Sequence, residues 1–80
     1  MKVIVNVFLK EGILDPQGKA TGHALEVMGF DGVNGVRIGK QILLDLSTSD
    51  ETVAKAEAEK MAKALLVNEV IEEYTIEIGA

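Results

Sequence analysis

The sequence contains no cysteine and no tryptophan, and its aromatic side chains are limited to Phe8, Phe30 and Tyr74. Without cysteine the chain can form neither a disulfide nor a thiolate zinc site. Its formal net charge is −5 over 80 residues, whereas surfaces that bind nucleic acid are basic and carry stacking rings. We therefore expect no nucleic acid partner.

Long apolar runs are also missing. No run approaches the roughly 18 residues that a membrane-spanning helix needs. The apolar stretch at the N-terminus reaches the polar residue Asn6 too early for the core of a signal peptide. Together with the absence of cysteine, these features lead us to expect a cytoplasmic protein with no membrane partner.

Aliphatic side chains are plentiful, since 48% of the residues are hydrophobic. A domain of this length buries only about 60–65% of the surface that its unfolded chain exposes. Its stability must therefore come from the apolar core, extended by self-association. We treat residues 1–80 as one domain.

The first residues alternate with the period of a β-strand. Valine or leucine occupies positions 3, 5, 7 and 9, and β-branched residues favour a pleated sheet. The opposite face is mixed, because Ile4 and Phe8 stand there among polar residues. A partner surface is one way to cover Ile4 and Phe8, and packing beneath a neighbouring loop is the other.

A helix is predicted from Pro16 to Met28. The Asp15 carboxylate can accept hydrogen bonds from the first free amides, and proline suits the first helical position because an N–H there has no partner. Gly29 is a suitable left-handed C-cap, with Phe30 folding back onto the last turn. The apolar face of this helix is predicted to comprise Ala20, Ala24, Leu25 and Met28.

Hydrophobic residues of one parity run through residues 36–46, interrupted by Lys40. They indicate either one long strand or two short strands joined by a hairpin turn at Gly39 and Lys40, since glycine suits the first central position of a type II′ turn. A two-residue turn preserves the parity of both strands, so the pattern does not distinguish these arrangements.

A second helix is predicted to begin near Thr48, whose spacing to Glu51 is that of a capping box, and to end near Asn68. Acidic and basic residues four apart on its outer side, Glu51 with Lys55 and Glu59 with Lys63, support it weakly. Its apolar stripe is predicted to comprise Ala54, Ala58, Met61, Ala62 and Leu65.

A last strand is predicted over Val70–Ile78, with Tyr74, Ile76 and Ile78 on one face. The resulting order is β-α-β(β)-α-β. Two amphipathic helices in this order predict an α+β fold, a two-layer sandwich in which both helices cover one face of an antiparallel sheet, related to the ferredoxin-like arrangement. The second face of the sheet is then open to a partner.

The sequence gives little evidence of a catalytic, metal-binding or phosphate-binding site. His23 is the one histidine, and without cysteine it lacks the companions of a metal site, so we interpret it as a surface or boundary residue. Two segments imitate phosphate-binding loops, but their glycine spacing is wrong and Lys19 is followed by Ala20 rather than by a hydroxyl residue. Glu72 and Glu73 point to opposite faces of a strand and do not form a carboxylate pair.

Three segments resemble the PurS family, and they occur in the family's order and spacing. They are Leu14–Ala20 (LDPQGKA) followed by Leu25 and the pair Gly29 and Phe30, Val36–Lys40 (VRIGK) leading into Ile42–Leu44, and Ala64–Tyr74 (ALLVNEVIEEY). The resemblance extends over essentially the whole chain.

The resemblance implies the small subunit of phosphoribosylformylglycinamidine (FGAM) synthase, an enzyme of purine biosynthesis. Such a subunit has no catalytic residues and no cofactor of its own. It forms a homodimer, or a tetramer, and bridges a large synthetase subunit that uses ATP and Mg²⁺ and a glutaminase subunit that releases ammonia. The small subunit is expected to support the transfer of that ammonia.

Candidate interface residues follow from these patterns. Ile4 and Phe8 lie on the open sheet face, while Gln17 and Lys19 are displayed beside the Asp15 cap, where we expect contacts with the larger subunit. Arg37 and Lys40 are cations in an acidic chain, suited either to an anionic partner or ligand or to ordinary solubility. The full set of candidates is Ile4, Phe8, Asp15, Gln17, Lys19, Arg37 and Lys40.

A small-molecule regulatory domain is the alternative from another class, because such domains bind amino acids between ferredoxin-like protomers. It accounts equally well for the predicted fold and for the glycine-rich turns. Stabilisation of the isolated protein by a ligand would favour it, and co-purification with synthetase and glutaminase subunits would favour the PurS assignment.

Overall fold

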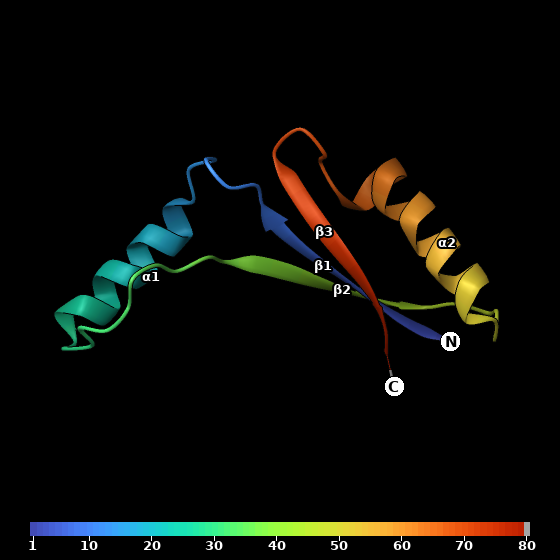
Figure 1. Ribbon diagram of the computed structural model, residues 1–80, viewed down its shortest axis with the longest axis horizontal. Helices are drawn as coiled ribbons and strands as arrows, with labels where there is room; N and C mark the ends of the chain where they lie inside the picture. The colour runs from blue at the N-terminus through green and yellow to red at the C-terminus, as the bar shows by residue number, and fades with distance from the viewer. Residues whose placement is uncertain (80) are drawn as a thin grey trace.

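The computed structural model describes residues 1–79. The elements follow the predicted α+β order, β-α-β-α-β (Figure 1). They are β1 (Lys2–Leu9), α1 (Pro16–Val27), β2 (Gly39–Asp45), α2 (Glu51–Met61), the π-helical turn η1 (Ala62–Leu66) and β3 (Glu72–Ile78).

The strands form one antiparallel sheet in the order β2-β1-β3. Val5 at the centre of β1 lies opposite Ile42 of β2 and Ile76 of β3, so residues of one parity share one face across all three strands. β2 begins at Gly39 and continues to Asp45 without a turn. Residues 36–46 therefore contain one strand and no hairpin, and residues 36–38 precede it in irregular backbone.

The core lies on the face of the sheet that carries the valines of β1, termed the inner face. Val3, Val5 and Val7 are at most 1% exposed. Val3 packs with the fully buried Ala54 and Ala58 of α2, whereas Val5 and Val7 pack with Ala62 of η1 and Val67. Alanine lets the helix backbone approach the sheet closely enough for β-branched side chains to fill the space between them. α2 packs in this way over β1 and β3.

At the C-terminal end of α2 the buried side chains differ from the predicted apolar stripe. The Val67 N–H donates to the Ala62 carbonyl at 2.9 Å, five residues back, which is the hydrogen bond of a π-helical turn. The wider turn rotates the following side chains, so Leu65 is 84% exposed while Leu66 and Val67 pack on the core. The predictions that Leu65 and Met61 belong to the stripe are wrong, since Met61 is also exposed.

The start of α2 also differs from the prediction. Asp50, not Thr48, is the N-cap, and its Oδ1 atom accepts hydrogen bonds from the amides of Thr52 at 2.9 Å and Val53 at 3.3 Å. The Thr48 hydroxyl accepts instead from the Asp50 amide at 3.1 Å. Glu51 is already the first helical residue, so no capping box forms. The two expected ion pairs, Glu51 with Lys55 and Glu59 with Lys63, are both present.

A turn around Asn68 delays the last strand, which begins at Glu72 rather than at Val70. The Asn68 carbonyl accepts from the Ile71 and Glu72 amides at 3.1 and 2.7 Å, and the Asn68 side chain accepts from the Val70 amide at 3.1 Å. These bonds hold Val70 and Ile71 out of the sheet. From Glu72 onward the alternation is as predicted, with Glu73 on the outer side.

Both predicted caps of α1 are confirmed. Asp15 has extended backbone and its side chain accepts from the Gly18 amide at 2.9 Å. Gly29 has a φ of 97°. The amides of Gly29 and Phe30 each donate at 3.0 Å to carbonyls of the last helical turn, those of Glu26 and Leu25, which closes the helix in a Schellman motif.

The position of α1 differs from the predicted sandwich, because α1 does not cover the sheet. It lies beyond the N-terminal end of β2, and the segment of residues 28–38 runs back along it (Figure 1). Gly18 and Gly22 face Val36 in that segment, and a Cβ atom at Gly18 would lie 2.3 Å from the Val36 carbonyl oxygen. We term α1 and residues 28–38 together the arm.

The arm makes the molecule open and elongated. The radius of gyration is 15.9 Å and the extents are 47 × 28 × 14 Å, whereas a compact chain of this length has a radius of about 12 Å. Ala20, Ala24 and Met28, predicted to face a core, are exposed. Periodicity identifies an apolar face but not what covers it. No helix within residues 1–79 has the length and apolarity needed to cross a membrane.

The contact between α1 and Val36 predicts opposite effects of one substitution at two glycines. Replacing either glycine by alanine favours the helix by roughly 1 kcal/mol. Gly22→Ala meets only the Val36 side chain at 3.5 Å, so we expect it to be neutral or stabilising. Gly18→Ala forces the backbones apart, so we expect a net loss of about 1–3 kcal/mol. Urea unfolding followed by circular dichroism, at one protein concentration, measures both, and equal effects would contradict the close approach.

Candidate functional site

Three of the predicted residues meet where the arm joins the sheet, at a site termed the hinge. An Nη atom of Arg37 donates to the Leu9 carbonyl oxygen and lies 3.1 Å from Glu73 Oε1. Its guanidinium carbon lies 5.3 Å from the centre of the Phe8 ring. The Arg37 and Glu73 side chains are both about half exposed. Sequence analysis gave Arg37 two interpretations, a cation for an anionic partner or ligand and an ordinary solubility charge. In the structure its guanidinium contacts its own chain.

Asp15 belongs to the same hinge. Its Oδ1 atom caps α1, and its Oδ2 atom accepts a hydrogen bond from the Ile38 amide at 3.1 Å. The amide of Gly18, and after it the amide of Ile38, hold the pKa of the Asp15 carboxyl below its ordinary value of 3.8. One carboxylate thus joins the beginning of α1 to the residue that precedes β2.

Lys40 lies on the other side of the sheet from Arg37. Its parity is that of Ile42 and Val7, so it extends from the inner face at the end that α2 does not reach. Its ammonium lies 3.9 Å from Glu72, whose side chain is 18% exposed and also accepts from the Asn68 amide at 2.8 Å. Arg37 and Lys40, which sequence analysis considered together, therefore lie on opposite faces of the sheet.

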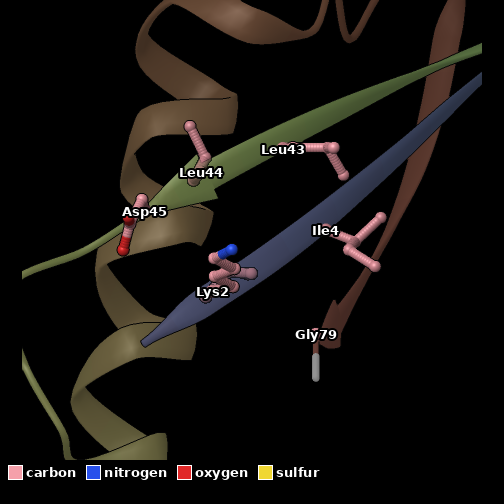
Figure 2. A pocket seen from close by; sticks show the side chains of 7 residues that line it. Lys2, Ile4, Leu43, Leu44, Asp45 and Gly79 are labelled. Atoms are coloured by element: carbon pink, nitrogen blue, oxygen red, sulfur yellow. The ribbon is translucent and has the colours of Figure 1, made fainter.

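Ile4 lies apart from the hinge, at the other end of the face opposite the core, termed the open face. Its neighbour across the sheet is Leu43, which is 71% exposed. The two side chains extend to the same side, whereas Leu44 extends toward α2 (Figure 2). They line an open cleft of about 390 Å³, with Lys2 and Asp45 at its edge.

A polar row crosses the open face between Ile4 and Phe8. Asn6 accepts from the Gln41 side-chain amide at 3.0 Å and donates to Glu77 at 2.9 Å. Its amide nitrogen also lies 3.4 Å from the Thr75 hydroxyl. These side chains satisfy one another across the strands, so the apolar contacts that the open face offers a partner lie at its two ends.

Gln17 and Lys19 lie on different sides of α1. Gln17 shares an exposed, largely apolar stripe with Ala20, Ala24, Val27 and Met28, at the spacing of one helical face. Val27 and Met28 on this stripe are 73% and 71% exposed. Lys19 is exposed on the polar side of α1, next to His23, which is exposed as predicted.

Sequence reasoning missed Glu73, Gly39 and Leu43 as members of these sites. Glu73 was assigned only to one face of a strand, and Gly39 either to the interior of a long strand or to a hairpin turn. The register that places both beside Phe8 joins three strands that are far apart in the chain. Leu43 carried a detectable signal, because it has the same parity on β2 as the polar residues of the open face.

The sequence was compared with known families and proteins. Residues 2–80 match the family PurS, described as phosphoribosylformylglycinamidine (FGAM) synthase. The chain is 45% identical over 76 residues to phosphoribosylformylglycinamidine synthase subunit PurS of Synechocystis sp., covering 95% of this chain and 76% of the relative. It is 46% identical over 77 residues to the subunit of the same name from Bacillus subtilis, covering 96% and 90%.

Solved structures give the same picture. PurS of Methanocaldococcus jannaschii, described as a subunit of formylglycinamide ribonucleotide amidotransferase in the purine biosynthetic pathway, matches with a TM-score of 0.87 and 37% identity, over 98% of this chain and 94% of that one. A chain in the structure of PurLQS from Thermotoga maritima matches with a TM-score of 0.89 and 28% identity, over 98% and 95%.

The two hydrogen bonds of Asp15 predict a defined dependence of stability on pH. Because the folded state lowers its pKa, the stabilisation is fully present above the unfolded value and is lost as the pH falls through the folded one. Asp15→Asn retains a capping oxygen but not the bond to Ile38. We expect wild type to be more stable than Asp15→Asn at neutral pH and this difference to shrink below pH 3.8.

Denaturant unfolding of both proteins from pH 7 to pH 2, with the Asp15 carboxyl followed by NMR, measures the effect. A stability difference that is the same at every pH would show that the carboxylate charge has no part in the hinge.

Proposed function

Because the chain belongs to the PurS family, we propose that it is the PurS subunit of an FGAM synthase of the PurLQS type and acts in purine biosynthesis. The observation that carries this proposal is the match of residues 2–80 to the family, supported by a TM-score of 0.89 to a chain of the T. maritima PurLQS structure. The cytoplasm is the compartment that this role implies.

The proposed role is that of a bridge without chemistry of its own. The chain binds neither ATP nor Mg²⁺, which belong to the large synthetase subunit, and glutamine is hydrolysed on the glutaminase subunit. It holds these two subunits together and supports the passage of ammonia between them.

Self-association is part of the proposal, and the arm is the element that we assign to it. α2 packs over β1 and β3. The inner-face residues of β2, Ile42 and Leu44, remain half-buried. In a two-layer sandwich a second helix would cover these inner-face residues of β2. Here α1 of the same chain lies beyond the N-terminal end of β2 instead (Figure 1). The α1 helix of a second copy can occupy the place.

The dimensions and chemistry of the two surfaces agree. The 12 residues of α1 span about 18 Å and the seven residues of β2 about 23 Å. The stripe that contains Ala20 and Ala24 is small enough to approach the sheet as closely as the alanines of α2 do. A reciprocal exchange of arms is isologous and closes at two copies.

Exchange of the arms covers the inner face and leaves the open face free. The open face carries the cleft at Ile4 and Leu43 at one end and Phe8 at the other. We assign the larger subunits to this face, which leaves the tetramer as a pairing of dimers through the same surface when those subunits are absent.

A charge in the middle of the α1 stripe tests the exchange. Ala24→Glu places a carboxylate where we expect burial, so the dissociation constant of the dimer should rise by about 100-fold or more, since an unpaired buried charge costs several kcal/mol. His23→Glu adds the same charge on the polar side of α1 and serves as the control. Sedimentation equilibrium measures both. A wild-type monomer at high concentration, or equal association of both variants, would refute the arrangement.

Reconstitution with a synthetase and a glutaminase subunit tests the bridging role. We expect glutamine-dependent formation of the amidine to require this chain, and ammonia-dependent formation to require it much less, since free ammonia bypasses transfer between subunits. Ala24→Glu should impair the glutamine-dependent reaction selectively, while His23→Glu should not. The isolated chain should show only background glutaminase and ATPase activity. Equal glutamine-dependent rates with and without the chain would contradict the proposed function.

A further inference from the structure

Arg37 joins the arm to the open face of the sheet through three different contacts. It donates to the Leu9 carbonyl oxygen, pairs with Glu73 at 3.1 Å, and stacks its guanidinium 5.3 Å from the centre of the Phe8 ring. Leu9 and Phe8 belong to β1 and Glu73 belongs to β3. One side chain of the arm is therefore held by two strands.

The sheet beneath Arg37 is shaped to receive it. Phe8 lies directly opposite Gly39 on one side and Glu73 on the other. A Cβ atom at Gly39 would come within 2.6 Å of the Phe8 ring and of the Val7 carbonyl oxygen. The missing side chain at Gly39 therefore lets the ring lie over the beginning of β2, two residues after Arg37.

The contacts reinforce one another although each is weak alone. An exposed ion pair or cation–π contact contributes little to stability. Here one guanidinium makes all three contacts, so the conformational entropy of the arginine side chain is lost once rather than three times. The bond of Asp15 with the Ile38 amide at 3.1 Å joins the beginning of α1 to the end of the returning segment, so the arm moves with the segment that carries Arg37.

We propose that Arg37, held by Phe8, the Leu9 carbonyl and Glu73, is a latch that fixes the direction of the arm relative to the sheet and so positions the arm for self-association. The effect on self-association rests on the proposed exchange of arms, whereas the effect on the arm's direction does not. Arg37 is a positioning residue, because it acts on the interface through α1.

The latch has a quantitative consequence for association. A protein that binds only from a competent conformation has an apparent dissociation constant equal to the intrinsic one divided by the competent fraction. Both copies must be competent in a reciprocal exchange, so the competent fraction enters twice. If loss of the latch lowers that fraction from near unity to about one third, the apparent dissociation constant rises about tenfold. The interface itself is unchanged, so the effect is smaller than that of a charge placed within it.

Distance measurement between two spin labels tests the latch directly. The chain has no cysteine, so Asp31→Cys at the tip of the arm and Glu57→Cys on α2 give two unique attachment points, both exposed. Labelled protein is diluted into an excess of unlabelled protein that has the same residue at position 37, so that each assembly holds one labelled chain. Pulsed electron paramagnetic resonance then measures the distance between the arm and α2, which packs on the sheet, within a single chain.

We expect a narrow distance distribution with Arg37 and a clearly broader one with Arg37→Ala. Arg37→Lys should broaden it as well, because an ammonium keeps the charge but cannot make the planar stack and the two polar contacts together. If circular dichroism shows that Arg37→Ala does not fold, the comparison of wild type with Arg37→Lys tests the latch instead. Lys55→Ala, which removes a cation from an exposed ion pair of α2, should leave the distribution narrow.

Equal widths for wild type and the Arg37 variants would overturn the latch. The second measurement is the dissociation constant of the unlabelled proteins, expected to be about tenfold weaker for Arg37→Ala. A broader distribution with unchanged association would retain the latch and overturn its role in positioning the arm for association. Failure of wild type to associate at all would overturn the proposed exchange of arms, while the distance measurement would still decide the latch.

Discussion

The close packing of three valines on β1 against the buried alanines of α2 and η1 is the contact on which the rest of the structure depends. Val3 is buried against Ala54 and Ala58, and Val5 and Val7 are buried against Ala62 and Val67. The small alanine side chains let the helix backbone approach the sheet closely. This approach places α2 over β1 and β3 and leaves the inner side of β2 without a helix. The fully assembled core of one chain is consequently small, and residues such as Leu44 and Ile42 remain half-buried. In the proposed exchange of arms, α1 of a second copy completes the core over β2.

The sequence predicted the ends of a helix correctly where these ends are set by contacts between residues close together in the chain. Asp15 and Gly29 bound α1 as predicted, since a cap involves residues within one turn. The same reasoning failed at Thr48, because Asp50 two residues later competes for the same free amides. It failed again at Leu65, because helical periodicity assumes 3.6 residues per turn and the π-helical turn after Ala62 is wider. An apolar pattern contains no separate signal for such a turn.

The candidate site was predictable as a set of residues but not as an arrangement. Phe8, Asp15 and Arg37 were each selected from sequence, yet their meeting at one hinge depends on a hydrogen bond between residues 28 apart and an ion pair between residues 36 apart. Ile4, Gln17, Lys19 and Lys40 lie elsewhere for the same reason, since their neighbours are set by the direction of the arm and by strand register. The functional assignment came from family resemblance, which uses the order of short segments and needs no knowledge of these contacts.

The position of β1 has a consequence for how the protein forms during synthesis. β1 is the first strand to be made but the central one in the sheet, and it pairs with residues 39–45 on one side and 72–78 on the other. Such long sequence separations make closure of the sheet a late and slow event. Until β3 has left the ribosome, the valines of β1 and one edge of that strand have no permanent partner, which is the state in which chains associate wrongly. Residues 16–38 can form the arm earlier, so the element assigned to self-association is ready before the sheet that receives it.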